Sequence, residues 1–111
     1  MSARTELLRG SVWTFRYLDD DEPKPVVIVS NDGRNRSRFA WVHVIRITTR
    51  PKRPLPTIVE LSDRDAPLRG RAMADELELV HKDDLEDRRG LLCPATMDAI
   101  DLALRRVLDL R

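Results

Sequence analysis

The stretch KPVVIVSND, residues 24–32, decides the fold expected for this chain. Four consecutive β-branched residues, Val26 to Val29, predict a strand that is buried on both faces. Lys24 precedes a proline, which favours an extended backbone and places this cation at the start of the strand. The segment SNDG, residues 30–33, predicts a polar turn at the other end, because short polar side chains bond the local backbone there. A rigid strand with Lys24 at one end and Asn31 at the other suits a binding site, although a plain core strand has the same pattern.

The composition is that of one soluble globular domain. The length of 111 residues fits a single domain, and we expect residues 1–111 to form it. Apolar residues make up 41% of the chain, and no run approaches the roughly 18 apolar residues that a membrane helix needs. The first residues lack the apolar stretch of a signal peptide. The single cysteine, Cys93, excludes an internal disulfide and fits a reducing compartment, so we expect a cytoplasmic location without a membrane partner.

Positive charge is concentrated in the middle of the chain. Between Gly33 and Arg53 there are seven basic residues and no acid, whereas acids outnumber bases after Glu60. Such asymmetry suits an anionic partner such as nucleic acid, and a solvated basic face is the alternative explanation. The basic residues of this stretch that follow or end the longest expected strand are Arg46, Arg50, Lys52 and Arg53.

Alternating side chains predict the other strands. In residues 10–17 three aromatic side chains, those of Trp13, Phe15 and Tyr17, share one face. Residues 39–48 form the longest expected strand, and near its end Arg46 and Thr48 point the same way. Shorter strands are expected at residues 57–61 and 71–79, and short and long helices at residues 82–88 and from Pro94 onward.

Neither a metal site nor a cofactor site is expected. The acidic loop at residues 19–22 lacks the spaced ligand pattern of a cation site and is expected to be solvated. Zinc motifs, phosphate-binding loops and nucleophile elbows have sequence signatures that this chain does not contain. Composition and spacing therefore lead to a small, mostly antiparallel barrel or curled sheet closed by a C-terminal helix.

The order of five segments resembles the MazF/PemK family of toxins. The resemblance extends from Arg9 to Leu110, and its segments are RGSVW at 9–13, KPVVIVSND at 24–32, ITT at 47–49, LPTIVE at 55–60 and MDAIDLAL at 97–104. It implies an SH3-like small antiparallel barrel of the MazF/PemK/CcdB type, mainly β with a C-terminal helix (α+β). It also implies the toxin of a type II toxin-antitoxin system, which acts as a homodimer and is inhibited by a cognate MazE-like antitoxin.

The resemblance further implies a metal-independent endoribonuclease that cuts single-stranded mRNA to a 2′,3′-cyclic phosphate and a 5′-hydroxyl. The family's usual arginine before the proline of its second strand falls on Lys24, and its threonine after the third strand falls on Thr48. One branch uses an aspartate base whose position falls on Asp75, although this residue is equally suited to pairing with Lys24. A cation neutralises phosphate, a threonine donates a hydrogen bond, and a carboxylate accepts a proton. With these catalytic candidates, the expected substrate-binding residues are Asn31, Arg46, Thr49, Arg50, Lys52 and Arg53.

Three differences separate this chain from the usual family pattern. Lysine replaces arginine at position 24, so the bidentate phosphate contact is lost. The loop before Lys24 is short and acidic, and the segment DELE at 75–78 lacks an arginine for which Arg46 is a substitute. Two alternatives to a ribonuclease therefore remain: a catalytically inert binding module, and a barrel toxin that inhibits a protein target such as gyrase.

Overall fold

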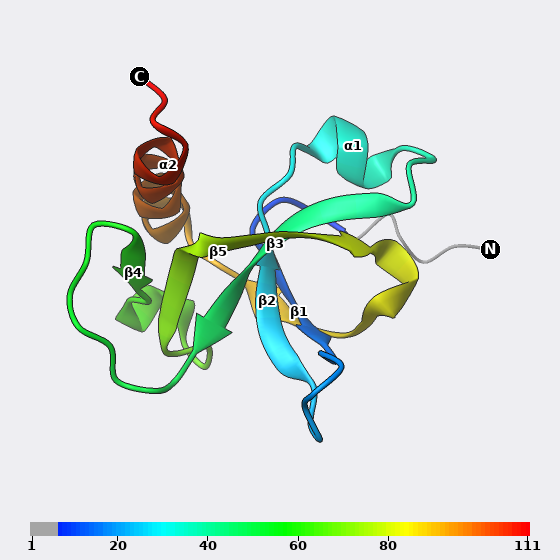
Figure 1. Ribbon diagram of the computed structural model, residues 1–111, viewed down its shortest axis with the longest axis horizontal. Helices are drawn as coiled ribbons and strands as arrows, with labels where there is room; N and C mark the ends of the chain where they lie inside the picture. The colour runs from blue at the N-terminus through cyan, green and yellow to red at the C-terminus, as the bar shows by residue number, and fades with distance from the viewer. Residues whose placement is uncertain (1–6) are drawn as a thin grey trace.

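In a computed structural model that describes residues 7–111, six antiparallel strands form a curled sheet that carries a long C-terminal helix (Figure 1). In chain order, the strands are β1 Ser11–Phe15, β2 Lys24–Ile28, β3 Trp41–Thr48, β4 Ile58–Glu60, β5 Arg71–His81 and β6 Leu85–Leu91. Their order across the sheet is β4-β5-β3-β2-β1-β6. The helices are α1 Asp32–Arg36 and α2 Pro94–Leu108, with short 3₁₀ turns at η2 Asp63–Asp65 and η3 Lys82–Asp84.

The strand predicted from residues 26–29 lies at the centre of the sheet as β2, and its burial on both faces is confirmed. Val27 packs into a core between the sheet and α2, whereas Val26 and Ile28 pack into a second core on the opposite face. All three side chains are fully buried. Because β1 and β3 flank β2, its backbone is paired along both sides and the strand is rigid.

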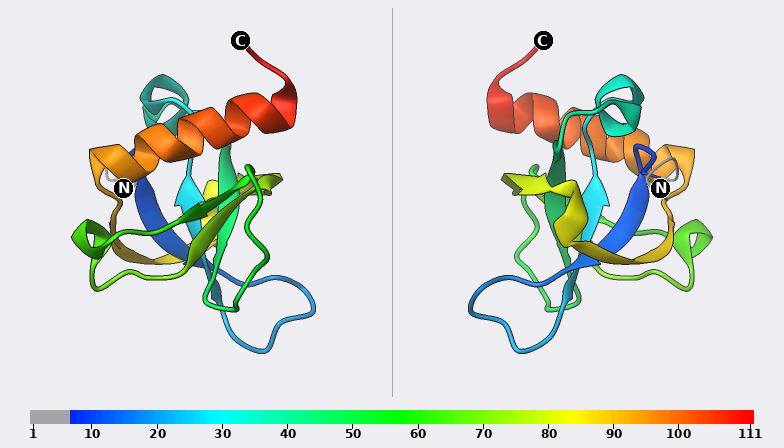
Figure 2. Two further views of the ribbon diagram at one scale, coloured as in Figure 1. Left: turned by 90° about the vertical axis from the view of Figure 1, so that its left-hand side faces the viewer. Right: turned by 90° about the vertical axis from the view of Figure 1, so that its right-hand side faces the viewer.

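Two hydrophobic cores, one on each face of the sheet, hold the fold together. The first lies under α2, which crosses one side of the sheet, and it includes Ile45, Met97 and Ile100. The second lies within the curl of the sheet and contains Trp13, with Phe15 and Tyr17 packed against it as predicted. Figure 2 shows α2 at one end of the molecule and the loop between β1 and β2 projecting at the other end.

The predicted fold class, mainly β with a C-terminal helix, is confirmed. Within residues 7–111 no pairing joins β4 to β6, so the curled sheet keeps two edges. None of the helices described here has both the length and the apolar character needed to cross a membrane.

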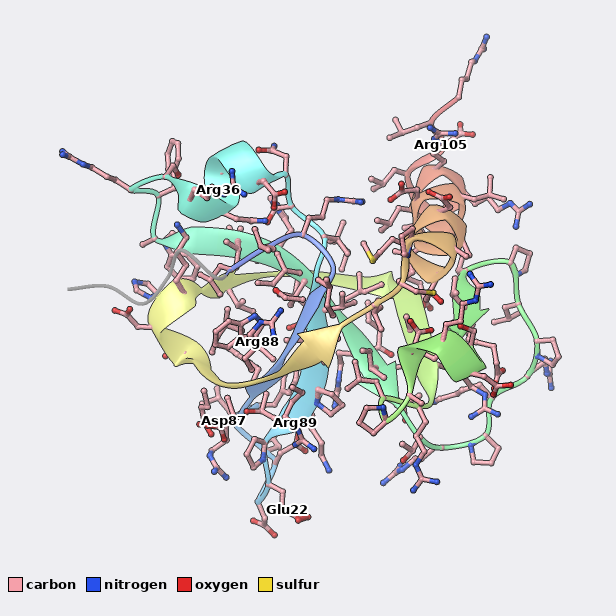
Figure 3. All side chains as sticks on the ribbon, turned by 180° about the vertical axis from the view of Figure 1, so that it is seen from behind. Glu22, Arg36, Asp87, Arg88, Arg89 and Arg105 are labelled. Atoms are coloured by element: carbon pink, nitrogen blue, oxygen red, sulfur yellow. The ribbon has the colours of Figure 1, made fainter. Side chains whose placement is uncertain are left out.

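The helix predicted at residues 82–88 is wrong, because only η3 is helical and the chain then continues as β6. Leu85 is buried in the second core and begins a strand that pairs with β1 as far as Leu91. β6 is an edge strand, and its charged residues Glu86 to Arg89 are exposed, which hides the alternation expected of a strand. Figure 3 labels three of them, Asp87, Arg88 and Arg89.

The turn predicted at residues 30–33 is also wrong, since this segment begins the five-residue helix α1. The Asn31 side chain accepts a hydrogen bond from the backbone N–H of Arg34 at 2.8 Å and so caps the helix. Buried Asn35 donates to the Ser30 carbonyl at 2.9 Å. The same short polar side chains that favour turns are also the preferred helix caps, which explains the error.

Candidate functional site

A cavity opens where β2 begins and β3 ends. Val26 of β2 is paired with Arg46 of β3. Lys24 lies two residues before Val26 and Thr48 lies two residues after Arg46, so both are at the same end of this antiparallel pair. Both residues line this cavity, which has a volume of about 320 Å³. Its other lining residues are Asp20, Pro25, Arg46, Ile47, Thr49, Arg50, Lys52, Met73 and Glu76. We refer to it below as the site cavity.

Three cations of the site cavity are available to an anionic ligand. Within residues 7–111, Lys24, Arg50 and Lys52 form no ion pair. Lys24 is half-buried at the first position of β2, while Arg50 and Lys52 are exposed on the loop after β3. A phosphate bound in the cavity would therefore meet positive charge from two different segments.

The Thr48 hydroxyl is oriented by the backbone that follows it. Its oxygen accepts a hydrogen bond from the Arg50 N–H at 3.1 Å, which leaves the hydroxyl hydrogen free to donate. Gly70, with φ of 116°, runs so close that a Cβ at this position would collide with the Thr48 carbonyl. Only glycine suits both this dihedral angle and this contact, so Gly70 fixes the end of β3.

Arg46 is the most constrained cation of the site cavity. Its guanidinium lies 3.7 Å from the Asp20 carboxylate and 3.8 Å from the Glu76 carboxylate, and it stacks on the Tyr17 ring at 4.2 Å. Burial, together with the nearby Glu78 carboxylate, raises the pKa of the Tyr17 phenol far above its ordinary value. Tyr17 is therefore neutral and serves as a platform under Arg46.

The site cavity contains a carboxylate from β5, but it is not Asp75. Asp75 is exposed and is absent from the cavity lining, whereas the next residue, Glu76, lines it. Sequence reasoning missed both carboxylates of the cavity, Asp20 and Glu76. The sequence predicts a solvated loop around Asp20, and it does not show the irregular strand pairing that turns Glu76 inward.

Two other predicted binding residues lie outside the site cavity. Arg53 lines a neighbouring cavity of about 400 Å³, to which Lys52 and Arg71 also contribute. Lys52 borders both cavities, so the basic surface continues from one to the other. Asn31 lies beyond the opposite end of β2, where its side chain caps α1. The structure therefore brings together Lys24, Arg46, Thr48, Thr49, Arg50 and Lys52, with Arg53 adjacent.

The sequence as a whole matches a known family. Residues 8–108 match the model described as the PemK-like, MazF-like toxin of type II toxin-antitoxin systems. The chain belongs to the PemK/MazF toxin family. The resemblance drawn from the five segments is thereby confirmed.

Curated members of the PemK/MazF family are similar along nearly the whole chain. Endoribonuclease MazF1 from Mycobacterium bovis is 45% identical over 103 residues, which cover 93% of each protein. Endoribonuclease MazF4 from Mycobacterium tuberculosis has the same identity and coverage.

Solved structures of the family share the fold. A mycobacterial endoribonuclease in complex with its cognate antitoxin is 42% identical, with a TM-score of 0.84 over 94% of this chain and 96% of the other. The Mycobacterium tuberculosis toxin MazF-mt6 is 22% identical with a TM-score of 0.75, so the curled sheet persists at low sequence identity.

Proposed function

We propose that this chain is the toxin of a type II toxin-antitoxin system and that it cuts single-stranded mRNA without a metal ion. The observation that carries the proposal is the site cavity, where free cations and a threonine hydroxyl border a carboxylate. Family membership and the 45% identity to proteins named endoribonucleases support the same activity.

The proposed reaction is an internal transesterification of RNA. The 2′-oxygen forms a bond to phosphorus while the bond from phosphorus to the 5′-oxygen breaks, leaving a 2′,3′-cyclic phosphate and a 5′-hydroxyl. A base takes the 2′-hydroxyl proton, and an acid supplies a proton to the departing 5′-oxygen. Lys24 is well placed to neutralise the phosphate, and Thr48 to donate a hydrogen bond to a non-bridging oxygen as negative charge develops there.

The RNA strand is proposed to follow the basic surface from Lys24 past Arg50 to Arg53. Lys52 and Arg53 contribute charge along this path, and Thr49 contributes a polar side chain at its start. Arg71 borders the second cavity, but its guanidinium is paired with Glu60 at 3.1 Å. Recognition by backbone charge suits a single strand whose bases remain free.

The activity is tested with purified protein, a long single-stranded RNA and excess EDTA. We expect cleavage, with cyclic phosphate at the new 3′ ends and hydroxyl groups at the new 5′ ends. A single-stranded DNA of the same sequence is the matched control, and it should stay intact because it lacks the 2′-hydroxyl nucleophile. Intact natural RNA would overturn the proposal: DNA damage in cells that express the chain would then support gyrase inhibition, and its absence an inert binding module.

We further propose that the protein is a cytoplasmic homodimer that binds a MazE-like antitoxin. Several large apolar side chains are exposed, and three of them, Leu18, Trp41 and Leu79, line one cavity. A small domain buries a limited core, and association would cover such residues. Light scattering at micromolar concentration should give the mass of two chains, and a monomer would count against the dimer. The antitoxin complex of the relative that is 42% identical supports the partner.

A further inference from the structure

The pairing between β3 and β5 is interrupted beside the site cavity. Ile45 is paired with Leu77, but the next residue of β3, Arg46, is paired with Met73. The three residues between Met73 and Leu77 therefore have no partner in β3. On the other side of β5, the Ala74 N–H donates to the Thr57 carbonyl at 2.9 Å. Bulges of this kind redirect side chains, and they are frequent next to active sites.

The three residues of this bulge have different surroundings. Ala74 is fully buried in the core under α2, and Asp75 is exposed. Glu76 lines the site cavity, with its Oε1 atom 3.8 Å from Nη1 of Arg46. The bulge thus brings a carboxylate into the cavity one residue after the position that resemblance indicates.

Asp20 is the other carboxylate of the site cavity, but the oxygen that faces Arg46 is shielded from a substrate. Its Oδ2 atom, which lies 3.7 Å from Arg46, is buried without a hydrogen-bond partner within residues 7–111. The Glu76 side chain, by contrast, is 40% exposed. Asp20 and Arg46 also line a second cavity, of about 680 Å³, which contains the aromatic side chains of Phe15, Tyr17 and Trp41. Asp20 therefore lies in the wall between the two cavities.

We propose that Glu76, and not Asp75, is the general base of the ribonuclease reaction, an inference that rests on the proposed function. The Glu76 carboxylate takes the 2′-hydroxyl proton as the 2′-oxygen attacks phosphorus, and the 5′-oxygen leaves with a proton from the site. Arg46 is a positioning residue, because its guanidinium contacts the Glu76 carboxylate and holds it in place. The Tyr17 ring and Asp20 hold Arg46 in turn.

Two isosteric changes at neighbouring positions test the assignment. Glu76→Gln should lower the single-turnover cleavage rate by about 10²- to 10⁴-fold, the usual loss for a positioned base. Glu86→Gln is the inert control, because this exposed residue lies on β6 and pairs with Arg16. Asp75→Asn is the competing variant. A larger loss in Asp75→Asn than in Glu76→Gln, or an unchanged rate in Glu76→Gln, would overturn the proposal.

Binding and pH dependence separate a missing base from a damaged structure. The affinity for RNA that carries 2′-deoxyribose at the cleaved nucleotide should be the same in Glu76→Gln as in wild type, since the base does not hold the phosphate. The pH–rate profile of wild type should have an ascending limb that Glu76→Gln lacks, because the variant has no carboxylate to accept the proton. Arg46→Lys should lower the cleavage rate in the wild-type background and have little further effect in Glu76→Gln, since the compact ammonium does not hold the carboxylate as the planar guanidinium does.

Failure of this inference is distinguishable from failure of the proposed function. A wild-type chain that yields no cyclic phosphate overturns both. A wild-type chain that cuts RNA, with a Glu76→Gln variant that cuts equally well, overturns only the role of Glu76.

Discussion

Asp65 accepts a hydrogen bond from the Thr96 hydroxyl at 2.6 Å, and this buried contact ties the loop after β4 to the first turn of α2. The same carboxylate accepts from the backbone N–H groups of Cys93 and Ser62, each at 2.8 Å. One buried carboxylate thus satisfies donors from two segments that are about thirty residues apart in the chain. The position of α2 over the sheet depends on it.

The stability of the protein should therefore respond to the charge on Asp65. Burial raises the pKa of Asp65, but the bonds from Thr96, Cys93 and Ser62 outweigh burial and leave the pKa below its ordinary value. The Asp65 carboxylate therefore binds a proton more weakly in the folded state than in the unfolded state. Its contribution to the free energy of unfolding is complete above about pH 4 and is lost as the pH falls through the pKa of the folded state. Asp65→Asn should lower the free energy of unfolding at pH 7 by about 1–3 kcal/mol.

Urea denaturation of both proteins at pH 7 and at several values below pH 4 measures this effect. The difference between wild type and Asp65→Asn should shrink as the solution becomes more acidic. A difference that stays constant down to the lowest pH would show that the charge of Asp65 has no part in it.

The core beneath α2 should tolerate little loss of volume. Ile45 is fully buried there, and Ile45→Ala should lower the free energy of unfolding by about 2–5 kcal/mol through lost burial and an unfilled cavity. Leu102→Ala is the control, because Leu102 lies on α2 but is 47% exposed. Urea denaturation should show a much smaller loss in the free energy of unfolding for Leu102→Ala. Equal losses in the two variants would contradict the placement of Ile45 in the core beneath α2.

Sequence reasoning reached the central strands and the cations of the site because both depend on local pattern. The run of β-branched residues at 26–29 and the alternation leading to Arg46 and Thr48 are visible without knowledge of tertiary contacts. β6 was missed because an edge strand with charged residues on its exposed side has no apolar alternation. The helix that Asn31 caps is not foreseen because caps and turns use the same side chains.

The carboxylates of the site show a different limit of sequence reasoning. Whether Asp75 or Glu76 enters the cavity depends on the register between β3 and β5, and that register changes between Ile45 and Arg46. A change of one residue reverses the direction of every side chain in a strand. Asp20 lies 3.7 Å from Arg46 because the β1–β2 loop brings it beside β3, a contact between distant positions that no local pattern encodes.

RNA binding should weaken with salt in proportion to the phosphates that are neutralised. If the basic surface at Arg50, Lys52 and Arg53 contacts about three phosphates, the slope of log K against log[salt] should be near −2, since a single strand contributes roughly −0.7 per phosphate. Fluorescence anisotropy with a non-cleavable RNA measures this slope. Arg50→Ala combined with Arg53→Ala should reduce both affinity and slope, and a salt-independent affinity would contradict the proposed surface.

Position 24 offers a test of phosphate binding by the first residue of β2. Lys24→Ala should lower cleavage by about 10²- to 10⁴-fold, as expected for the loss of a positioned catalytic group. Lys24→Arg should raise cleavage above wild type, because a guanidinium makes two parallel bonds to phosphate where an ammonium is a point charge. Single-turnover kinetics on one RNA compares the three proteins. A Lys24→Arg variant slower than wild type would mean that the cavity selects the smaller cation.

The thiol of Cys93 should react at lower pH than an ordinary cysteine. Its contacts with Thr96, including a side-chain contact of 3.3 Å, lower the pKa of Cys93. The rate of alkylation by iodoacetamide should therefore reach half of its maximum at a lower pH in the folded protein than in urea. Equal midpoints in the two conditions would show that the helix start leaves the thiol unchanged.

Different residues of β2 serve stability and chemistry. Val26 to Ile28 hold the sheet together, and Lys24, at the end of the same strand, faces the cavity. A substitution at Lys24 can therefore abolish cleavage without unfolding the chain. A silenced toxin of this kind, such as Lys24→Ala, would remain a folded decoy that still occupies antitoxin. In a cell that contains both proteins, the inactive variant would compete for antitoxin and would thereby release active toxin.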